Sequence, residues 1–368
     1  MKKAGKISRP FLFWTIILVI FGFFIFTSAS LGILARDEVK FSSVAFNQIF
    51  YGLLLGSIAC IIFARIDYHI WKKYSFFIFI GSILLTLLVF IDALNIVHGG
   101  AKRWVDLRII SFQPSEILKI GFVVYFAGWL SSIKRNVETF KWGLVPFLVI
   151  MAVIGGILLA QPDTDTFAVI LFAGLSMYIV AGAKWKHIIL ILTIGIVIIT
   201  VLAFTRPYIM QRIESMIDPS SNIQTTGYQL RQSLIAVGSG QMWGRGFGQS
   251  IQKFEYLPEP IGDSVFAVAA EEFGFVGTSI LIFTFVMFTL QGMRIANRAP
   301  DDFGKFLALG IVIMIISQAF LNIGGMIGVL PLTGIPLPFI SHGGTALFIT
   351  LVKVGVIMNI SRSAKPKG

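Results

Sequence analysis

Asp263 is the carboxylate in this chain whose position most favours chemistry. It closes the polar stretch 205–264 and stands two residues before a hydrophobic run that begins at Val265. Ionisable groups at or within a membrane are costly, and proteins retain them mainly for binding, proton transfer or transport. A carboxylate held there can accept a proton from a reacting hydroxyl. Asp263 is therefore a candidate general base, and a role in transport is the alternative.

Residues that could bind an anion lie before and inside the fourth hydrophobic run, 112–130. Arg103 belongs to the short loop 98–104, where its guanidinium fork could grip phosphate oxygens or anchor the loop at the interface. Glu116 and Lys119 are three residues apart, so they share a helix face and can pair. They form either a structural ion pair or a site in which Lys119 faces a cavity and binds an anion.

Two carboxylates could hold a metal ion in the connection between the fifth and sixth runs. Asp163 and Asp165 lie in the sequence Gln-Pro-Asp-Thr-Asp-Thr at 161–166. Carboxylates with hydroxyls suit a hard cation such as Mg²⁺ or Mn²⁺. A tight Pro-Asp turn followed by a helix N-cap is the alternative. We expect at most a divalent cation here and no organic cofactor.

Two features of the C-terminal quarter need partners from elsewhere in the fold. The proline-rich segment 330–339 cannot continue a helix. Non-helical backbone near a membrane must be buried or line a cavity, so this segment is expected to shape a cavity wall. Lys353 lies midway along the last hydrophobic run, and we expect it to pair with Glu271 or Glu272 of another helix.

The composition indicates which kind of structure holds these residues in place. Charged residues make up 13% of the chain and hydrophobic residues 56%, whereas soluble domains carry about 25% charge. The chain is expected to be an all-α polytopic membrane protein, with residues 1–368 forming a single membrane domain. Apolar runs long enough to cross a bilayer predict ten spans, near 11–34, 46–64, 74–94, 112–130, 143–160, 166–182, 187–204, 265–290, 306–327 and 342–360.

The distribution of Lys and Arg predicts the orientation. If both termini are cytoplasmic, the short cytoplasmic segments hold eighteen Lys and Arg and the short external segments five. This is the bias of the positive-inside rule. The large loop, about 205–264, between spans 7 and 8, is then extracytoplasmic. The net charge of +12 follows from this bias, so no nucleic-acid partner is expected.

Several short motifs follow one another along the chain. They are Ser28-Ala29-Ser30, Ala101-Lys102-Arg103-Trp104, Gln113-Pro114-Ser115-Glu116 with Lys119, Gln161-Pro162-Asp163, Leu257-Pro258-Glu259 with Asp263, and Pro336-Leu337-Pro338-Phe339-Ile340-Ser341 with Gly343-Gly344. Taken together and in this order, they make the chain resemble the SEDS family of FtsW and RodA peptidoglycan polymerases. The resemblance covers about residues 11–360.

The resemblance implies roles for the candidate residues. Asp263 stands where the family has its essential external-loop acid, and Arg103 and Lys119 where it has basic cavity residues. Glu116 and Glu259 fall in family motifs and are expected to contact substrate. A helix N-terminus lowers the pKa of an acid, whereas a general base needs it raised, so burial or Glu259 would have to raise the pKa of Asp263.

The chain departs from the family pattern at three places. Thr164-Asp165 replaces Leu-Gly after the Gln-Pro-Asp motif, and Asp165 could add to a cation site. Ile261-Gly262 replaces His-Thr before the acid. His342 replaces a tyrosine.

The resemblance implies an inverting glycosyltransferase of the bacterial cytoplasmic membrane. It would polymerise lipid II at the outer face, with undecaprenyl pyrophosphate leaving. The expected partners are lipid II, a class B penicillin-binding protein transpeptidase, and other divisome or elongasome membrane proteins. Ser28-Ala29-Ser30 and the run 98–104 favour an FtsW-like division role over a RodA-like elongation role. A lipid II flippase and a scaffold for a partner synthase are the alternatives.

Overall fold

The computed structural model describes residues 7–98, 101–106, 111–219 and 226–363. Helices dominate, and η denotes short 3₁₀ or π-helical segments. The first part of the chain forms α1 (Arg9–Leu34), α2 (Glu38–Phe46), η1 (Asn47–Leu55), α3 (Gly56–Phe63), α4 (His69–Lys73), α5 (Ser75–Leu87), η2 (Leu88–Phe90), β1 (Asn95–His98), β2 (Ala101–Asp106), β3 (Ser111–Phe112), α6 (Pro114–Ile133) and η3 (Lys134–Glu138).

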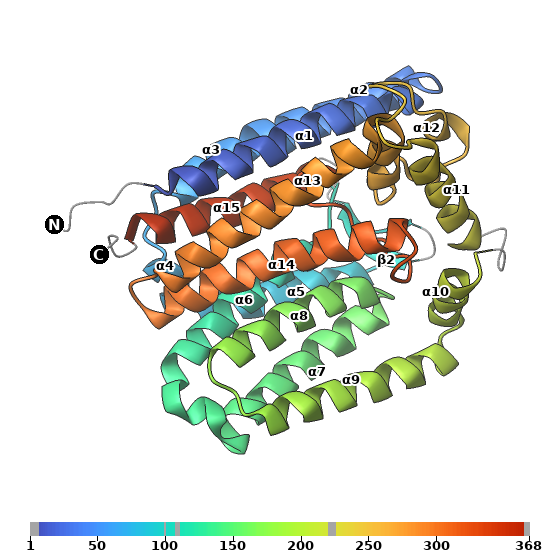
Figure 1. Ribbon diagram of the computed structural model, residues 1–368. Coiled ribbons are helices and arrows are strands. Elements are labelled where there is room, and N and C mark those ends of the chain that lie inside the picture. The colour runs from blue at the N-terminus through green and yellow to red at the C-terminus, as the bar shows by residue number, and fades with distance from the viewer. Residues whose placement is uncertain (1–6, 99–100, 107–110, 220–225, 364–368) are drawn as a thin grey trace.

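The rest of the described chain is helical apart from its connections. It forms η4 (Phe140–Leu144), α7 (Val145–Ala160), α8 (Thr164–Val180), α9 (Trp185–Thr205), α10 (Pro207–Ile217), α11 (Thr226–Ser239), α12 (Gln252–Glu255), α13 (Val265–Asn297), α14 (Asp302–Met326) and α15 (Gly344–Ser363). The start of α1 and the end of α15 lie at one end of the bundle, and α10, α11, α12 and β2 lie at the other (Figure 1).

Among the described residues, eight helices are long and apolar enough to cross a membrane, and Ser75–Phe90 and Thr164–Val180 are shorter apolar helices. Each falls on one of the predicted runs, so the all-α polytopic class is confirmed. The count of ten spans and the external position of the large loop stay predictions. Both chain ends of the bundle lie on the same side, as an even number of spans requires (Figure 1).

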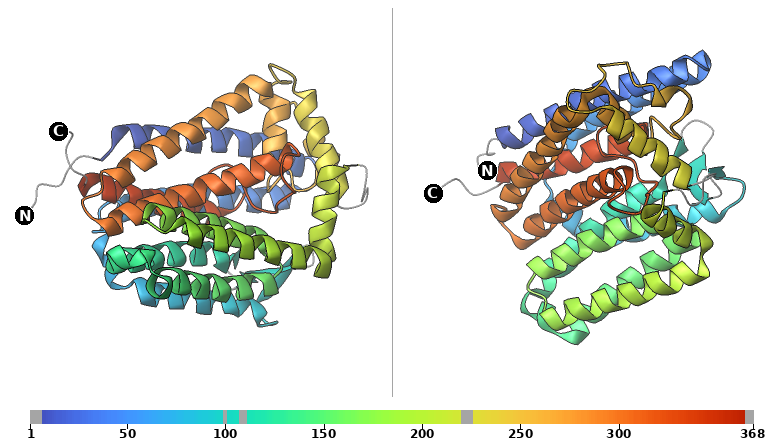
Figure 2. Two further views of the ribbon diagram at one scale, coloured as in Figure 1. Left: turned by 60° about the horizontal axis from the view of Figure 1, so that its bottom comes forward. Right: turned by 45° about the vertical axis from the view of Figure 1, so that its right-hand side comes forward.

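Burial separates central from peripheral helices. Within their apolar stretches, 67% of α14 and 83% of α15 is buried, against 11% of α9. Figure 2 shows α14 between α13 and α8 in both views, and α14 packs on both of them. In a membrane, helices associate by close packing rather than by hydrophobic expulsion from water. The exposed apolar side chains of α9 therefore suit contact with lipid.

A small antiparallel sheet occupies the loop that carries Arg103. β1 pairs with β2, with Asn95 opposite Val105 and an irregularity between Ile96 and Val97, and β2 pairs with β3. The sequence predicted only a short loop here. Residues 99–100 of the 98–104 run lie outside the described residues. The sheet holds Arg103 at the end of the bundle that also carries α10 to α12 (Figure 1).

The predicted span 265–290 is not one straight helix. α13 breaks at Gly274, whose backbone has φ 64° and ψ −166°. A broken helix leaves carbonyl and N–H groups without intrahelical partners. The stretch Gln241–Gly246 supplies them: Phe275 N and Val276 N donate to Gln241 O and Met242 O, and Arg245 N and Gly246 N donate to Glu271 O and Glu272 O.

Only glycine fits at this break. A Cβ on Gly274 would lie 2.3 Å from the backbone nitrogen of Gly244, and its φ is left-handed. The half-helix 265–273 is consequently a separate element, and Asp263 lies just before its first turn. The loop 240–246 and the two halves of α13 fix where that acid stands.

Candidate functional site

Asp263 is held by helices from distant parts of the sequence. Its backbone oxygen accepts a hydrogen bond from Asn322 Nδ2 of α14 at 2.7 Å, and its Oδ1 accepts one from Gln229 Nε2 of α11 at 3.3 Å. Ser341 Oγ donates to the neighbouring Gly262 oxygen at 2.6 Å. The half-buried acid therefore has a fixed main chain and a carboxylate with one side-chain donor from another helix.

The surroundings of Asp263 favour its use as a base. Burial raises the pKa of Asp263 to about 6, the Gln229 hydrogen bond opposes the rise, and the charge of Glu259 adds to it. A base works best when its pKa lies near the working pH. Burial together with Glu259 thus outweighs the lowering expected at a helix N-terminus.

Glu259 lies beside this acid but is exposed to solvent. Its backbone has a left-handed φ of 46°, which is uncommon for a residue other than glycine. A Cβ on Gly262 would lie 3.4 Å from Glu259 Oε2, so the carboxylate lies over the main chain next to Asp263. The predicted substrate contact of Glu259 stays a prediction.

Arg103 is half-buried and reaches from the sheet to two loops. Its Nη2 donates to the carbonyl oxygen of Pro162. Its Nη1 lies 3.6 Å from where a Cβ of Gly334 would stand. Its Nε is buried with no hydrogen-bond partner in the described part of the chain. This guanidinium therefore lies where the Gln-Pro-Asp turn meets the proline-rich segment and keeps an unused donor.

The sequence did not identify Arg212, the other cation of this region. Arg212 Nη1 of α10 lies 2.9 Å from both carboxylate oxygens of Asp165, and Gly334 N donates to Asp165 Oδ2 at 3.2 Å. Opposing the effect of burial, Asp165 and to a smaller extent Asp263 raise the pKa of Arg212. The signal in the sequence was the extra acid: a largely buried Asp165 needs a cationic partner.

The observed contacts of Asp163 and Asp165 do not fit a metal site. Asp163 caps α8 by accepting from Thr166 N at 3.3 Å, and it also accepts from Ser115 Oγ at 3.3 Å. Asp165 is neutralised by Arg212. Over the described ranges there is no group of three or more His, Cys, Asp or Glu side chains that could hold a metal ion. The divalent cation stays a prediction.

Glu116 and Lys119 form the predicted ion pair deep in the bundle. Lys119 Nζ lies 2.5 Å from Glu116 Oε1 and 2.9 Å from Gln318 Oε1 of α14. The side chains of Lys119 and Glu116 are only 1% and 6% exposed. This enclosed geometry matches the structural alternative, and substrate contact by these two residues stays a prediction.

The expected partner of Lys353 was wrong. Lys353 Nζ lies 3.5 Å from Glu116 Oε2 rather than beside Glu271 or Glu272. Those two acids lie in the half-helix 265–273, where Arg245 and Lys253 pair with them. The lysine is midway along α15, so it meets α6 instead of the half-helix 265–273.

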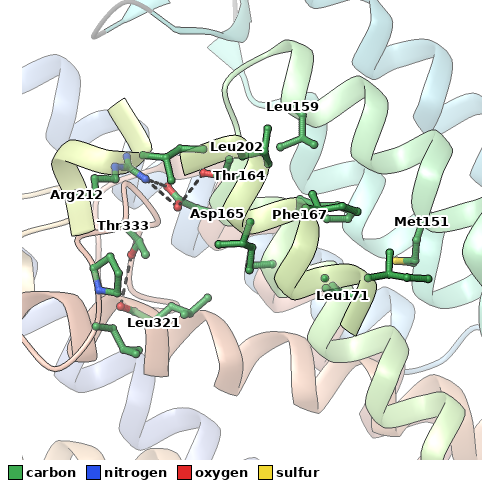
Figure 3. Close-up of a pocket in the computed structure, with 18 of the residues that line it drawn as sticks. Met151, Leu159, Thr164, Asp165, Phe167, Leu171, Leu202, Arg212, Leu321 and Thr333 are labelled. Atoms are coloured by element: carbon green, nitrogen blue, oxygen red, sulfur yellow. Dashed lines mark hydrogen bonds and ion pairs between the residues drawn. The ribbon is translucent and has the colours of Figure 1, made fainter. Parts of the chain in front are cut away.

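A cavity of about 360 Å³ opens between α7, α8, α9, α10 and α14. Arg212, Asp165, Thr164 and Thr333 lie at one end of it, and apolar side chains such as Phe167 line the rest (Figure 3). Leu330 to Thr333 form part of the wall. The prediction that the proline-rich segment shapes a cavity wall is confirmed.

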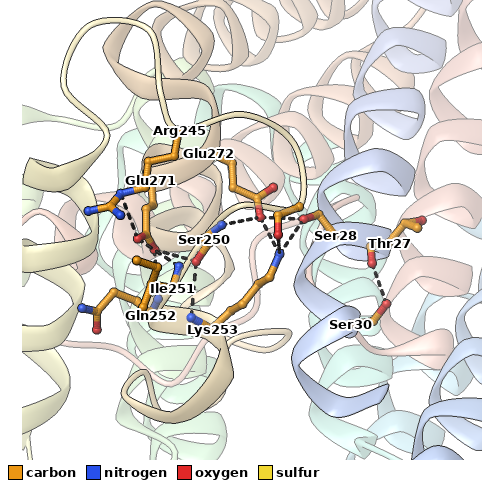
Figure 4. A network of polar contacts seen from close by, with 11 residues as sticks. Thr27, Ser28, Ser30, Arg245, Ser250, Ile251, Gln252, Lys253, Glu271 and Glu272 are labelled. Carbon is orange, nitrogen blue, oxygen red and sulfur yellow. Dashed lines mark hydrogen bonds and ion pairs between the residues drawn. The ribbon is translucent and has the colours of Figure 1, made fainter. Parts of the chain in front are cut away.

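A buried polar network ties the segment 245–253 to α1 and α13 (Figure 4). Lys253 Nζ lies 2.7 Å from Glu272 Oε1 and 3.0 Å from Ser28 Oγ, and Ser28 Oγ donates to Glu272 Oε1 at 2.6 Å. Ser250 Oγ donates to Glu271 Oε2 at 2.5 Å. Ser28 of the Ser-Ala-Ser motif thus helps to fix the half-helix that follows Asp263.

The protein is an integral membrane protein, since its helices are long and apolar enough to span a membrane. Its candidate site combines a half-buried carboxylate with an apolar cavity that has a cation at its polar end. The chain belongs to the FtsW, RodA and SpoVE family, since a family model described as "Cell cycle protein" matches residues 9–366.

Curated relatives cover most of the chain. Stage V sporulation protein E of Bacillus subtilis (strain 168) is 38% identical over 311 residues, which is 84% of this chain and 85% of that protein. The probable peptidoglycan glycosyltransferase FtsW of Geobacter sp. (strain M18) is 36% identical over 364 residues, which is 98% of each chain.

Solved structures share the fold. A chain from a structure described as "Structural coordination of polymerization and crosslinking by a peptidoglycan synthase complex" matches with a TM-score of 0.81 at 24% identity, covering 98% of this chain and 99% of that one. The rod shape determining protein RodA of Thermus thermophilus matches with a TM-score of 0.71 at 24% identity, covering 98% of each.

Proposed function

We propose that this protein is a peptidoglycan glycosyltransferase that polymerises lipid II at the outer face of the cytoplasmic membrane. The observation that carries the proposal is that one residue links the cavity to the acid. Arg212 lines the polar end of the apolar cavity, and it is close enough to Asp263 for their charges to interact. A relative named probable peptidoglycan glycosyltransferase FtsW, matched along 98% of both chains, supports the same activity.

The chemistry of lipid II corresponds to these parts. Its apolar polyprenyl chain needs an apolar groove, and the cavity lined by α7, α8 and α9 is largely apolar. Its pyrophosphate needs fixed cations. Arg212 lies at the polar end of the cavity (Figure 3), and Arg103 contacts the nearby Gln-Pro-Asp turn at Pro162. Its sugars then reach the loop that carries Asp263. Lys119 is 1% exposed and bonded to Glu116 and Gln318, so the proposal assigns it no part in binding the pyrophosphate.

In the proposed reaction, the 4-hydroxyl of the acceptor sugar attacks the anomeric carbon of the donor. The new bond forms to that oxygen as the bond from carbon to pyrophosphate oxygen breaks, and in-line attack inverts the centre. Asp263 takes the hydroxyl proton, and the arginines stabilise the negative charge of the departing undecaprenyl pyrophosphate. The carboxylate needs its raised pKa for this role.

The test is polymerisation by the purified protein. In detergent with purified lipid II and no ATP, a polymerase forms glycan strands visible on a gel, either alone or with its transpeptidase partner. A flippase forms no glycan and instead exchanges lipid II between leaflets of a vesicle. A scaffold does neither. Absence of glycan in both preparations would refute the proposed activity.

We also propose an FtsW-like role with a class B penicillin-binding protein as partner. The FtsW name of the relative from Geobacter sp. (strain M18) supports the first part. The solved peptidoglycan synthase complex, described as coordinating polymerization and crosslinking, supports the second. Depletion of this protein should then give filaments without septa rather than round cells, and co-purification should identify the transpeptidase.

We predict that activity follows the protonation of Asp263. Its carboxyl, with pKa about 6, is ionised above that value and protonated below it. Because only the ionised form accepts a proton, kcat/KM should reach a plateau above pH 7 and fall to about a tenth of it at pH 5. Glu259→Gln removes a charge that raises this pKa, so the midpoint should move to lower pH. A flat profile from pH 5 to 8 would contradict the assignment.

We predict that Arg212→Gln lowers kcat/KM for lipid II about 10- to 100-fold, mostly through KM, because a charge-assisted hydrogen bond contributes about 1.5–3 kcal/mol. The single change also leaves Asp165 without its cation. Asp165→Asn/Arg212→Gln should recover thermal stability but not KM. Arg206→Gln, at an exposed position before α10, is the matched control. Recovery of both quantities in the double variant would limit Arg212 to ion pairing.

A further inference from the structure

Two of the chain's departures from the family pattern meet in space. The backbone nitrogen of His342 donates a hydrogen bond to the carbonyl oxygen of Ile261 at 2.7 Å. The family resemblance puts a histidine at position 261 and a tyrosine at 342, and this chain has Ile261 and His342. The loop before α13 therefore lacks an imidazole at position 261, and the loop that bonds to it carries one at position 342. Position 261 is two residues before Asp263.

The side chain of His342 has an unused polar atom. Its ring stacks on Phe26 of α1, with centroids 6.0 Å apart and an interplanar angle of 18°. Its Nε2 is buried and has no hydrogen-bond partner in the described part of the chain. Buried polar groups in native proteins are nearly always paired, and one left unpaired carries a desolvation cost. A partner in the working state would remove that cost.

The imidazole adds a kind of group that the nearby acids cannot supply. Burial lowers the pKa of His342 to about 4 although Glu259 acts in the opposite direction, so the ring is neutral at physiological pH. A neutral imidazole has one donor and one acceptor nitrogen, whereas the ionised carboxylates of Asp263 and Glu259 only accept. A sugar that gives its hydroxyl proton to Asp263 still has other oxygens that need donors.

Building on the proposed polymerase function, we propose that His342 contacts the substrate: its imidazole hydrogen-bonds a hydroxyl or acetamido oxygen of the acceptor sugar at Asp263. In this proposal His342, in the loop before α15, makes the sugar hydrogen bond that a histidine at position 261, in the loop before α13, would make. Ser341 already bonds the Gly262 oxygen at 2.6 Å, which keeps the two loops in register.

The test is a reciprocal exchange measured by lipid II polymerisation. His342→Phe keeps the stack on Phe26 but lacks both nitrogens, and His342→Tyr puts the family residue there. Both should lower kcat/KM about 10-fold or more, mainly through KM. Ile261→His/His342→Tyr should recover to within about threefold of wild type. Adding Gly262→Thr completes the family motif, and a Cβ there meets nothing nearer than 3.4 Å.

Each result has a distinct meaning. Wild-type activity in His342→Phe would overturn the inference, because the imidazole would then act only by packing on Phe26. Failure of both exchange variants to recover, with thermal unfolding unchanged in detergent, would overturn the idea that the two positions are equivalent. If wild-type protein itself makes no glycan with or without its transpeptidase, the proposed function fails first. If the wild-type protein is active, the exchange variants test only the role of His342 and not the proposed function.

Discussion

Asp263→Asn should abolish glycan synthesis, with a loss of about 10²- to 10⁴-fold in kcat. Asparagine has nearly the same shape and does not disturb the Asn322 bond to the main-chain oxygen of residue 263. Gln229 can rotate its amide to bond the new side chain. What asparagine cannot do is accept the proton of the attacking hydroxyl.

The measurement is initial-rate polymerisation of purified lipid II, alongside thermal unfolding in the same detergent. Glu255→Gln removes an exposed acid from the same loop, 205–264, and should keep normal activity. Equal losses in both variants would indicate a general effect of loop charge. Retention of a third or more of wild-type activity in Asp263→Asn would exclude this residue as the base.

Lys253→Met is expected to produce the largest loss of stability, about 3–5 kcal/mol. Lys253 and Glu272 are 0% and 1% exposed, so the substitution leaves a carboxylate enclosed without its cation. Lys253 Nζ also donates to Gly248 O at 2.9 Å, and that bond is lost as well. The half-helix 265–273 should loosen first, and activity should fall with it.

A double-mutant cycle separates the charge effect from packing. Lys253→Met/Glu272→Gln removes both charges and should be far less destabilised than Lys253→Met alone. Lys40→Met, at an exposed position in α2, is the matched control and should leave the thermal midpoint unchanged. Additive losses in the cycle would mean that the two side chains do not interact.

The helices were largely predictable because apolar length is a local property of the sequence. The predicted runs 112–130 and 187–204 correspond to α6 (Pro114–Ile133) and α9 (Trp185–Thr205). The break in α13 was not predictable, because Gly274 is one of two glycines in the run 265–290 and membrane helices tolerate glycine. The break depends on the segment 241–246, an earlier part of the chain that forms hydrogen bonds with both sides of it.

The site was predictable where interacting residues lie close together in the sequence. Glu116 and Lys119 pair because they are three residues apart on one helix. Arg212 was missed and Lys353 was given the wrong partners for a common reason: their partners, Asp165 and Glu116, lie far away in sequence. Which charges meet across a bundle depends on helix depth and rotation, and an apolar pattern carries little information about either.

The position of Lys353 has a consequence for how the chain enters the membrane. A lysine at the centre of an isolated helix opposes insertion by about 2.5–3.5 kcal/mol. Glu116 enters earlier with Lys119 already beside it, and its Oε2 lies 3.5 Å from Lys353 Nζ in the finished bundle. α15 therefore finds this counter-charge in α6, which is synthesised before it, so the insertion of α15 should be coupled to the prior assembly of α6.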